Sequence, residues 1–498
     1  MTLRAKTARG FAFESAKTVT LLLIATAKLA VVARLLNPQA FGLFALALAL
    51  LTGVETLTQI GSDRYLIQKK TLVPGLVGCV WLFGIFRGSL ICIVTILLAP
   101  LYAGLSHQPA AADILYVVAF ASLARGFKSP GSFLAERDIN YLKVGTYEVC
   151  VAVFDAAVII GLTVLFRNAR ALALGMLCSA VVEALLSYAL FGVRFEAKFN
   201  WQAFAELISV GKHFMVIGVC SYIMLQGDNL TVAALLGTTM LGYYVIAYKL
   251  VDLPLRITFQ ITNRVAFSAL SRLQTDQRRM AKAFLELLDL QVTVLLPLIA
   301  FIVLVPRTVV TGLYGSHWQQ SIVVVRALGL IMLGRGMTNI VVPFLMARGD
   351  YRYISKIKVL ETVAFLIGVI VGCKIYGLVG VAIGGGIGFA VALAMRLRYI
   401  IKIGNIDLNR LLESLTPVVT ALLLPALAVI ICERFLNMPA VAQLAVSGIV
   451  FFGLYLVITY FGRRDFVRRI TDTLDVFRRP LPMTAAASGV SQQERELV

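Results

Sequence analysis

The sequence 226–263 decides the fold, and it reads QGDNLTVAALLGTTMLGYYVIAYKLVDLPLRITFQITN. Two largely apolar segments flank the short turn 236–240, and each belongs to a segment long enough to form a membrane-spanning helix. Lys249, Asp252 and Arg256 are spaced three and four positions apart, so a helix places them on one face. Charged groups inside a bilayer cost about 2.5–3.5 kcal/mol each. The stretch therefore predicts a helical hairpin whose polar stripe faces a bundle interior or an aqueous path.

The composition is that of a membrane protein. The chain has 498 residues, of which 59% are hydrophobic and only 14% charged, and its mean hydropathy is +0.88. The apolar runs are continuous, which favours an all-α polytopic membrane protein over a β-barrel. The seven cysteines form no CxxC pair and no Cys/His cluster, so we expect no metal site and no cofactor. The net charge of +20 is expected to come from basic cytoplasmic loops, not from a nucleic-acid surface.

Apolar segments of about 20 residues predict about 14 transmembrane helices. The expected spans are 13–35, 40–60, 77–98, 112–130, 145–166, 170–193, 212–236, 240–263, 283–305, 320–345, 356–375, 378–397, 413–433 and 440–461. The first of these follows a basic N-terminus and has no clear cleavage site, so we interpret it as a retained helix.

Basic residues alternate between the loops. Of the 46 Lys and Arg, 33 fall in the N-terminus, the loops after even-numbered spans and the C-terminus, and only 6 fall in the loops after odd-numbered spans. Cytoplasmic loops carry the excess of Lys and Arg. The alternation therefore predicts an even number of spans, with both termini in the cytoplasm.

An internal repeat appears at an offset of 200 residues. Residues 35–47 align without a gap with residues 235–247, with Leu, Leu, Gly and Ala at matching positions and Phe44 opposite Tyr244. Six predicted helices separate the two copies, and an even number preserves orientation, so we expect parallel repeats. The predicted units are a six-helix lobe at 1–193, a second six-helix lobe at 194–400, two additional helices at 401–462, and a basic, then disordered cytoplasmic tail at 463–498.

Four short motifs resemble those of Wzx-type polysaccharide transporters, which belong to the multidrug/oligosaccharidyl-lipid/polysaccharide exporter superfamily. They are the runs at 34–44, 135–138, 242–244 and 267–274. One position departs from the pattern, since Ser268 stands where the family usually has proline. The resemblance implies two six-helix lobes around a central cavity, in a multi-pass protein of the bacterial inner membrane.

The resemblance also implies a function. The transporter would flip undecaprenyl-diphosphate-linked oligosaccharide repeat units from the cytoplasmic to the outer leaflet, for lipopolysaccharide or exopolysaccharide biosynthesis. Its partners would be this lipid-linked oligosaccharide, membrane lipids, and a polysaccharide polymerase and chain-length regulator.

Cations within the predicted spans are candidates for binding a diphosphate, because ammonium and guanidinium groups both suit phosphate oxygens. The substrate-binding candidates are Lys28, Arg87, Lys249 and Arg256. The alternative is that Lys249, Asp252 and Arg256 neutralise one another along a single helix. Arg326 and Arg335 are nine residues apart, which is about 180° on a helix, so we expect at most one to face the cavity.

Carboxylates within the predicted spans are candidates for coupling transport to a proton or another cation. The ion-coupling candidates are Asp228, Asp252, Asp155 and Glu55. Asp228 is the counterpart of Lys28 at the 200-residue offset. Its alternative role is a salt bridge with Lys28 or Lys249.

Three other function classes compete with a flippase. A cation-coupled multidrug exporter of the same superfamily would have a cavity richer in acidic and aromatic groups than in cations. A membrane enzyme, such as a polysaccharide polymerase, needs acid–base or nucleophilic groups, and the sequence offers no His/Asp or Ser/His constellation. A non-transporting scaffold would have no use for buried charge. We therefore expect a transporter, not an enzyme, and no catalytic residue.

Overall fold

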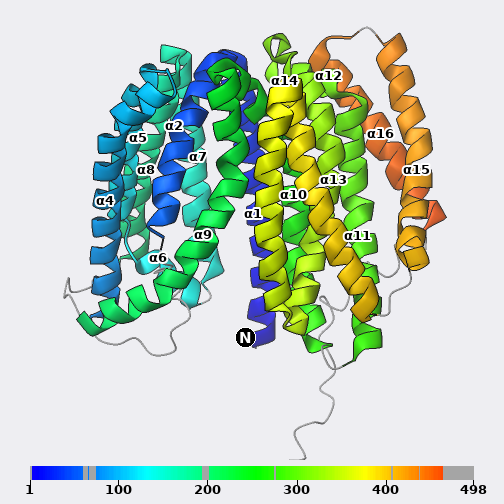
Figure 1. Ribbon diagram of the computed structural model, residues 1–498, viewed down its shortest axis with the longest axis horizontal. Helices are drawn as coiled ribbons and strands as arrows, with labels where there is room; N and C mark the ends of the chain where they lie inside the picture. Colours follow the sequence, from blue (N-terminus) through cyan, green and yellow to red (C-terminus); the bar gives the residue numbers. More distant parts are fainter. Residues whose placement is uncertain are drawn as a thin grey trace, which may run out of the picture.

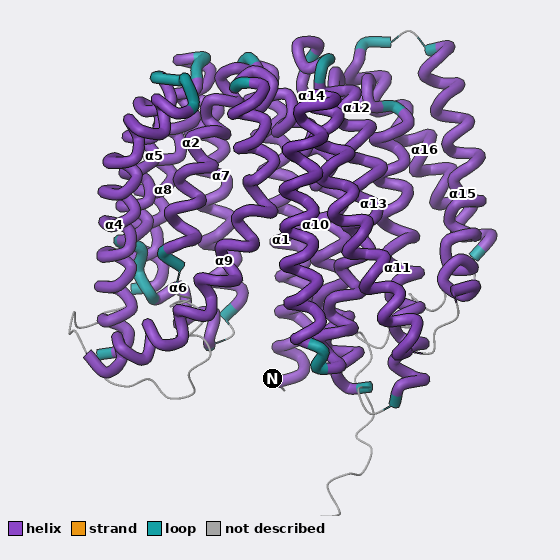
Figure 2. The backbone as a smooth tube through the Cα atoms, in the orientation of Figure 1, coloured by secondary structure: helices purple, strands orange, loops and turns teal. Residues whose placement is uncertain are grey.

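The chain is built from helices. The computed structural model describes residues 3–59, 66, 75–138, 140–192, 201–273, 276–404, 408–436 and 438–463. Within these ranges the backbone is helical apart from short turns, and Figure 2 shows no strand among them. The prediction of an all-α protein is confirmed. The predicted tail beyond Arg463 lies outside the described residues.

The helices follow the predicted spans closely. The first part of the chain forms α1 (Leu3–Leu35), α2 (Pro38–Leu57), α4 (Leu76–Leu105), α5 (Ala110–Gly126), α6 (Gly131–Arg137), α7 (Tyr141–Phe166) and α8 (Ala169–Phe191). The second part forms α9 (Trp201–Leu236), α10 (Thr238–Arg272), α11 (Gln277–Leu304), α12 (Pro306–Tyr314), the 3-10 helix η1 (Ser316–Trp318), α13 (Ser321–Arg348), α14 (Tyr351–Gly404), α15 (Leu408–Phe435) and α16 (Ala440–Gly462).

The longest element, α14, is a helical hairpin. Its 54 residues reverse direction at Gly377, whose φ of 58° suits glycine. Glycines pair symmetrically across the reversal: a methyl group built at Gly372 would lie 2.0 Å from the Gly380 carbonyl oxygen, and one at Gly368 would lie 2.2 Å from that of Gly384. The small residues thus let the two arms pack backbone to backbone. Each arm matches one predicted span.

The structure is that of a multi-pass membrane protein. Eleven of the described helices are long and apolar enough to cross a membrane, and the bent pair α5–α6 adds a twelfth. The pair bends by 57° after Gly126, so the predicted span 112–130 is interrupted. The polar residues of α10 keep it out of the eleven, and α14 counts once although it has two arms. The total of fourteen spans stays a prediction.

The helices form two groups that lie side by side (Figure 1). In one group α2, α4, α5, α7 and α8 pack together, and in the other α10, α11, α13 and α14 do so. The long helix α9 contacts both α2 and α14 and thereby links the groups. The last two helices, α15 and α16, lie at the far right of Figure 1, and α15 packs against α11. The division into two six-helix lobes and two added helices stays a prediction.

The two copies of the repeat meet where α2 and α10 begin. A methyl group built at Gly42 would lie 1.7 Å from the Thr238 carbonyl oxygen, and one at Gly242 would lie 1.9 Å from the Pro38 carbonyl oxygen. Pro38 and Thr238 are themselves counterparts at the 200-residue offset. Each copy therefore uses the same patch against the other, as in an interface with two-fold symmetry. The matching residues of the two copies thus meet in the structure, and the repeat of whole lobes stays a prediction.

An aromatic side chain closes the same end of the molecule. Trp318 is fully buried, and its indole nitrogen donates to the Ala33 carbonyl oxygen at 2.8 Å. Its ring meets Phe41 of α2 edge-on, with ring centres 5.4 Å apart, and Tyr243 of α10 at 5.9 Å. Aromatic rings in this geometry stabilise a contact beyond their buried area. The residue therefore ties α1 and α2 to α10.

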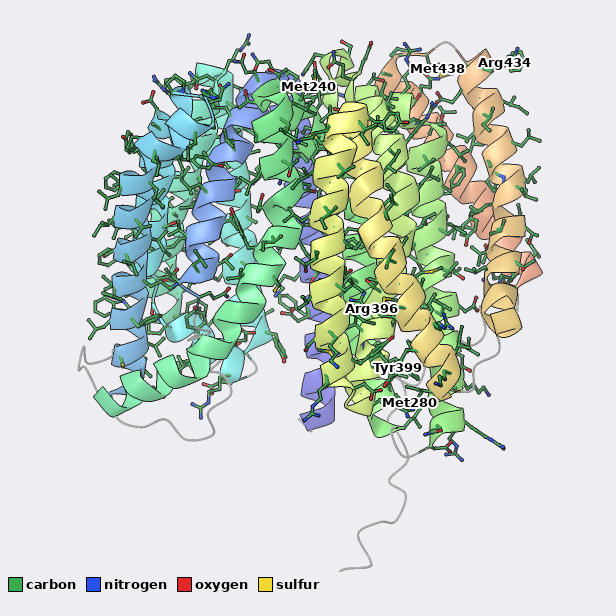
Figure 3. The ribbon with its side chains drawn as sticks, viewed as in Figure 1. Met240, Met280, Arg396, Tyr399, Arg434 and Met438 are labelled. Carbon is green, nitrogen blue, oxygen red and sulfur yellow. The ribbon has the colours of Figure 1, made fainter. Side chains whose placement is uncertain are left out.

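The turns gather at two opposite ends of the molecule (Figure 3). Met240, Arg434 and Met438 lie at one end, near turns that follow odd-numbered predicted spans. Met280 and Tyr399 lie toward the other end, near loops that follow even-numbered spans. The alternation of basic loops predicts that the first end lies outside and the second in the cytoplasm.

Reporter fusions test this topology. We expect fusions at His317 and at Gly377 to give a periplasmic signal, and a fusion at Gly349 to give a cytoplasmic one. The reason is that Gly349 follows an even-numbered predicted span, whereas the other two positions follow odd-numbered ones. The measurement is paired alkaline phosphatase and fluorescent-protein activity. A cytoplasmic signal at Gly377 would contradict the hairpin in α14.

Candidate functional site

Three of the predicted substrate-binding cations lie within electrostatic reach of one another, and we call Lys28, Lys249 and Arg256 the cation cluster. Lys28 is on α1, and the other two are on α10. Lys249 is surrounded by protein atoms, and the like charges of Lys28 and Arg256 act on it. Lys249 is exposed although it lies in the middle of α10, and the Arg256 side chain is 67% exposed. Like charges that face an accessible space favour an anionic ligand.

The members of the cation cluster differ in their acid partners. Lys28 forms an ion pair with Asp155 of α7. Arg256 Nε lies 2.5 Å from Asp252 Oδ2, one helical turn away. No acid partner of Lys249 occurs among the residues that the structure describes. The cluster and its described acid partners therefore have a net positive charge, which is that of Lys249. Neutralisation along α10 accounts only for Arg256 and Asp252.

Arg87 and Glu55 belong to a different part of the molecule. The Arg87 guanidinium donates to the carbonyl oxygens of Thr58 and Glu55 at 3.1 and 2.8 Å, where α2 ends. Cations are favourable at the C-terminus of a helix, where carbonyl groups lack helical partners. The Glu55 carboxylate accepts from the Ser122 hydroxyl at 3.0 Å. These residues line a cavity of about 230 Å³ between α2, α4, α5 and α6, so the structure does not bring Arg87 to the cation cluster.

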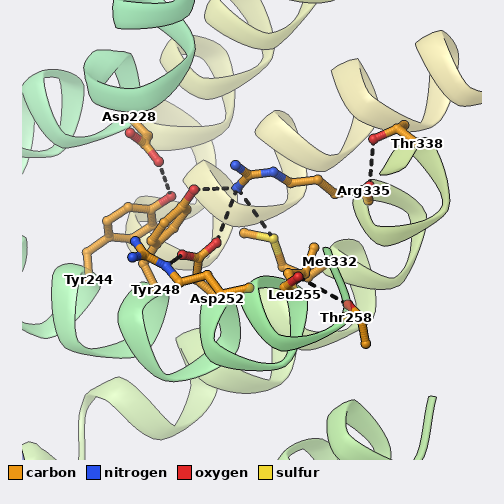
Figure 4. Close-up of polar contacts among 10 residues, drawn as sticks. Asp228, Tyr244, Tyr248, Asp252, Leu255, Thr258, Met332, Arg335 and Thr338 are labelled. Atoms are coloured by element: carbon orange, nitrogen blue, oxygen red, sulfur yellow. Dashed lines mark hydrogen bonds and ion pairs between the residues drawn. The ribbon is translucent and has the colours of Figure 1, made fainter. Parts of the chain in front are cut away.

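Asp228 lies in a buried polar cluster beside α10 (Figure 4). It is 4% exposed and accepts hydrogen bonds from the Tyr244 hydroxyl and the Asn229 backbone N–H, both at 2.8 Å. A buried carboxylate needs such donors because desolvation is costly. Asp228 thus has a tyrosine as its partner, and the salt bridge considered for it with Lys28 or Lys249 is not formed.

Arg335 of α13 completes this buried cluster, and the sequence did not single it out as a site residue. Its guanidinium donates to the Tyr248 hydroxyl, and its Nη1 lies 3.9 Å from Asp252 Oδ1. It also lies 5.8 and 5.5 Å from the ring centres of Tyr248 and Phe389, within the range of cation–π attraction. Arg326, nine residues earlier, is exposed on another face of α13. The spacing of the two arginines was the only sequence signal that separated them.

The structure holds a second buried ion pair, of which the sequence contains no sign. Arg396 Nη2 lies 2.7 Å from Glu361 Oε2, and both side chains are 3% exposed. Lys358 lies 3.5 Å from the same carboxylate oxygen. The pair joins the two arms of α14 in the lower half of the molecule (Figure 3). Periodicity within one helix gives no sign of a contact between residues on two arms of a hairpin.

The chemistry of these clusters is that of charge recognition. Among the described residues, no group of three His, Cys, Asp or Glu side chains is placed to hold a metal ion. The imidazole of His317 contacts the Ala33 carbonyl oxygen at 2.8 Å, so it takes part in packing at the end of α1. Accessible cations can bind an anion, and buried acids can respond to a change of charge.

Known proteins share the sequence pattern. The family model for "Polysaccharide biosynthesis protein" matches residues 31–324. The lipopolysaccharide biosynthesis protein WzxC of Escherichia coli (strain K12) is 23% identical over 387 residues, which are 77% of this chain and 78% of that protein. The teichuronic acid biosynthesis protein TuaB of Bacillus subtilis (strain 168) is 18% identical over 297 residues, which are 59% of this chain and 62% of that protein.

Solved structures share the fold. The lipid II flippase MurJ in an inward closed conformation superposes with a TM-score of 0.74 at 13% identity, over 92% of this chain and all of that one. An inward-facing multidrug resistance transporter of the MATE family, in the MOP superfamily, gives a TM-score of 0.56 at 16% identity, over 83% of this chain and 96% of that one. The prediction of an all-α polytopic membrane fold is therefore confirmed, and the two six-helix lobes stay a prediction.

Proposed function

This chain belongs to the polysaccharide biosynthesis protein family, and from that membership we propose that it flips lipid-linked oligosaccharides across the inner membrane. The substrate would be a repeat unit carried on undecaprenyl diphosphate, and the product would serve lipopolysaccharide or exopolysaccharide biosynthesis. The cation cluster is the observation that carries the proposal. It offers Lys28, Lys249 and Arg256 to an anionic headgroup within a membrane-spanning bundle.

The energetic problem of such a transporter is the diphosphate. Each unpaired charge at the bilayer centre costs several kcal/mol. Accessible cations lower that cost, and their exposure keeps them hydrated so that the substrate is not trapped. Arg256 is suited to grip two phosphate oxygens at once, whereas Lys249 supplies a mobile charge.

The lipid chain needs an apolar surface while the headgroup moves. An apolar groove of about 620 Å³ lies between α11 and α16, lined by residues such as Pro297 and Phe452. A second groove of about 460 Å³ lies between α9 and α14, lined by residues such as Gly227 and Leu366. Such surfaces favour a prenyl chain in contact with the bilayer. They support a headgroup path through the protein with the tail left in lipid.

The remaining finer assignments are part of the same proposal. Both termini would lie in the cytoplasm, and a polysaccharide polymerase with a chain-length regulator would consume the flipped units. Asp228 would couple transport to a proton or another cation. It is a buried acid on α9, the helix that precedes α10 of the cation cluster. A multidrug exporter is the second candidate, favoured by the superposition on the MATE transporter.

Deletion of the gene tests the function. We expect lipid-linked repeat units to accumulate on the cytoplasmic leaflet and surface polysaccharide to be lost, because no other step moves the diphosphate across. The measurement is mass spectrometry of extracted lipid-linked sugars, with leaflet assignment by an impermeant glycosidase. Single unpolymerised units on the cell surface would indicate a polymerase. Unchanged polysaccharide with raised drug sensitivity would indicate a drug exporter.

A further inference from the structure

One carboxylate, Asp252, stands between two arginines of different exposure. Its Oδ2 lies 2.5 Å from Arg256 Nε, and its Oδ1 lies 3.9 Å from Arg335 Nη1. The Arg256 side chain is 67% exposed, whereas that of Arg335 is 26% exposed and that of Asp252 only 11%. An accessible cation and an enclosed one therefore share the same acid, one at each carboxylate oxygen.

Arg335 also interacts with a second acid, Asp228. These two described residues form no ion pair, and the charge of Arg335 acts on Asp228 at longer range than on Asp252. Figure 4 shows Asp228, Arg335 and Asp252 around Tyr244 and Tyr248. The guanidinium is positioned by the Tyr248 hydroxyl and by the rings of Tyr248 and Phe389. Lys358 of α14 adds a second positive charge to the surroundings of Arg335. Arg335 thus lies between two acids, of which only Asp252 touches the cation cluster.

We propose that Arg335 is a positioning residue that passes a change of charge at Asp228, through Asp252, to Arg256. While Asp228 is ionised, it shares Arg335 with Asp252, and Asp252 holds Arg256. When Asp228 is neutralised, Arg335 shifts its attraction to Asp252, and the hold on Arg256 weakens. Arg256 is then free to bind phosphate oxygens. The proposal rests on the proposed function, because it names what regulates the headgroup site.

The arrangement predicts opposite effects for two substitutions. Asp228→Asn removes one acid from Arg335 and keeps an oxygen for the Tyr244 hydroxyl, so Arg256 is released and a diphosphate binds more tightly. Arg335→Gln leaves Asp252 with Arg256 alone, so a diphosphate binds more weakly. If Arg335 carries the signal, the double variant binds like Arg335→Gln, because residues in one charge network are not additive.

The experiment measures the affinity of the purified full-length protein in nanodiscs for farnesyl diphosphate. We expect Asp228→Asn to tighten binding and Arg335→Gln to weaken it, each by about three- to tenfold, which lies in the lower part of the range of coupling within one charge network. Arg335→Lys should restore part of the wild-type affinity. Arg326→Gln is the matched control, since Arg326 is on the same helix but exposed on another face, and its affinity should equal that of the wild type.

The outcomes separate the inference from the function. Weaker binding in both single variants, in step with their thermal stability, would mean that Arg335 only neutralises two acids, and would overturn the inference. If the wild type binds and Arg256→Ala does not, but Asp228→Asn and Arg335→Gln do not shift the affinity in opposite directions, the function stands. Only the inference is then overturned. Absence of wild-type binding would overturn both.

Discussion

We expect Arg256→Ala to abolish export of surface polysaccharide while the protein reaches the membrane in normal amount. The guanidinium is the group of the cation cluster that can grip two phosphate oxygens together. Its side chain is 67% exposed, so little packing is lost when it is removed. Asp252 keeps Arg335 at 3.9 Å and is not left as an unpaired buried charge. The measurement is complementation of a deletion strain, with membrane abundance determined in parallel, and export should fall by more than about tenfold.

Two further variants separate headgroup binding from charge balance. Arg256→Lys keeps the charge but loses the bidentate geometry, so it should retain partial export. Arg256→Ala combined with Asp252→Ala removes both members of the ion pair. If Arg256 existed only to neutralise Asp252, this double variant would export normally and be as stable as the wild type. Full complementation by Arg256→Ala alone would contradict the assignment of α10 to the headgroup site.

We expect Gly242→Ala to separate the two groups of helices at the end where the repeat copies meet. The added methyl group would lie 1.9 Å from the Pro38 carbonyl oxygen, and that oxygen belongs to the backbone of α2 and cannot rotate away. Overpacking of this kind costs about 1–3 kcal/mol. We expect a lower thermal unfolding temperature and a loss of export. Gly42→Ala should act alike, because its methyl group meets the Thr238 carbonyl oxygen at 1.7 Å.

Gly161→Ala is the matched control for these glycines. It lies within α7, and a methyl group there meets no atom within 4 Å. Alanine also favours a helix over glycine by about 1 kcal/mol, so Gly161→Ala should be neutral or slightly stabilising. Thermal unfolding of the purified variants checks both expectations. Wild-type unfolding temperatures for Gly42→Ala and Gly242→Ala would show that α2 and α10 do not depend on close backbone contact.

Local pattern predicted the features that depend on neighbours in sequence. The apolar runs gave the helices and the hairpin of α14, and the spacing of Asp252 and Arg256 gave their ion pair. The 200-residue offset pointed to Gly42 and Gly242, which the structure brings together. Gln260 and Asn263 extend the polar stripe in sequence, but their side chains lie outside those that the structure describes.

The sequence could not predict contacts between residues that are distant along the chain. Lys28 pairs with Asp155, 127 positions away on another helix, and not with the acid that the repeat aligned with it. The rotation of each helix about its axis decides such pairs, and a single sequence constrains that rotation only weakly when apolar residues surround the helix. The same reason explains why Arg87 was grouped with the cation cluster although it caps the end of α2.

Translocation in proteoliposomes tests the central claim most directly. The purified chain is reconstituted with a fluorescent polyprenyl-diphosphate oligosaccharide, and an impermeant quencher reports the fraction of label that reaches the opposite leaflet. The wild type should move the labelled lipid between leaflets, and Arg256→Ala at equal reconstitution should not. Equal translocation by wild type and Arg256→Ala, or none above protein-free vesicles, would contradict a flippase that uses the cation cluster as its headgroup site.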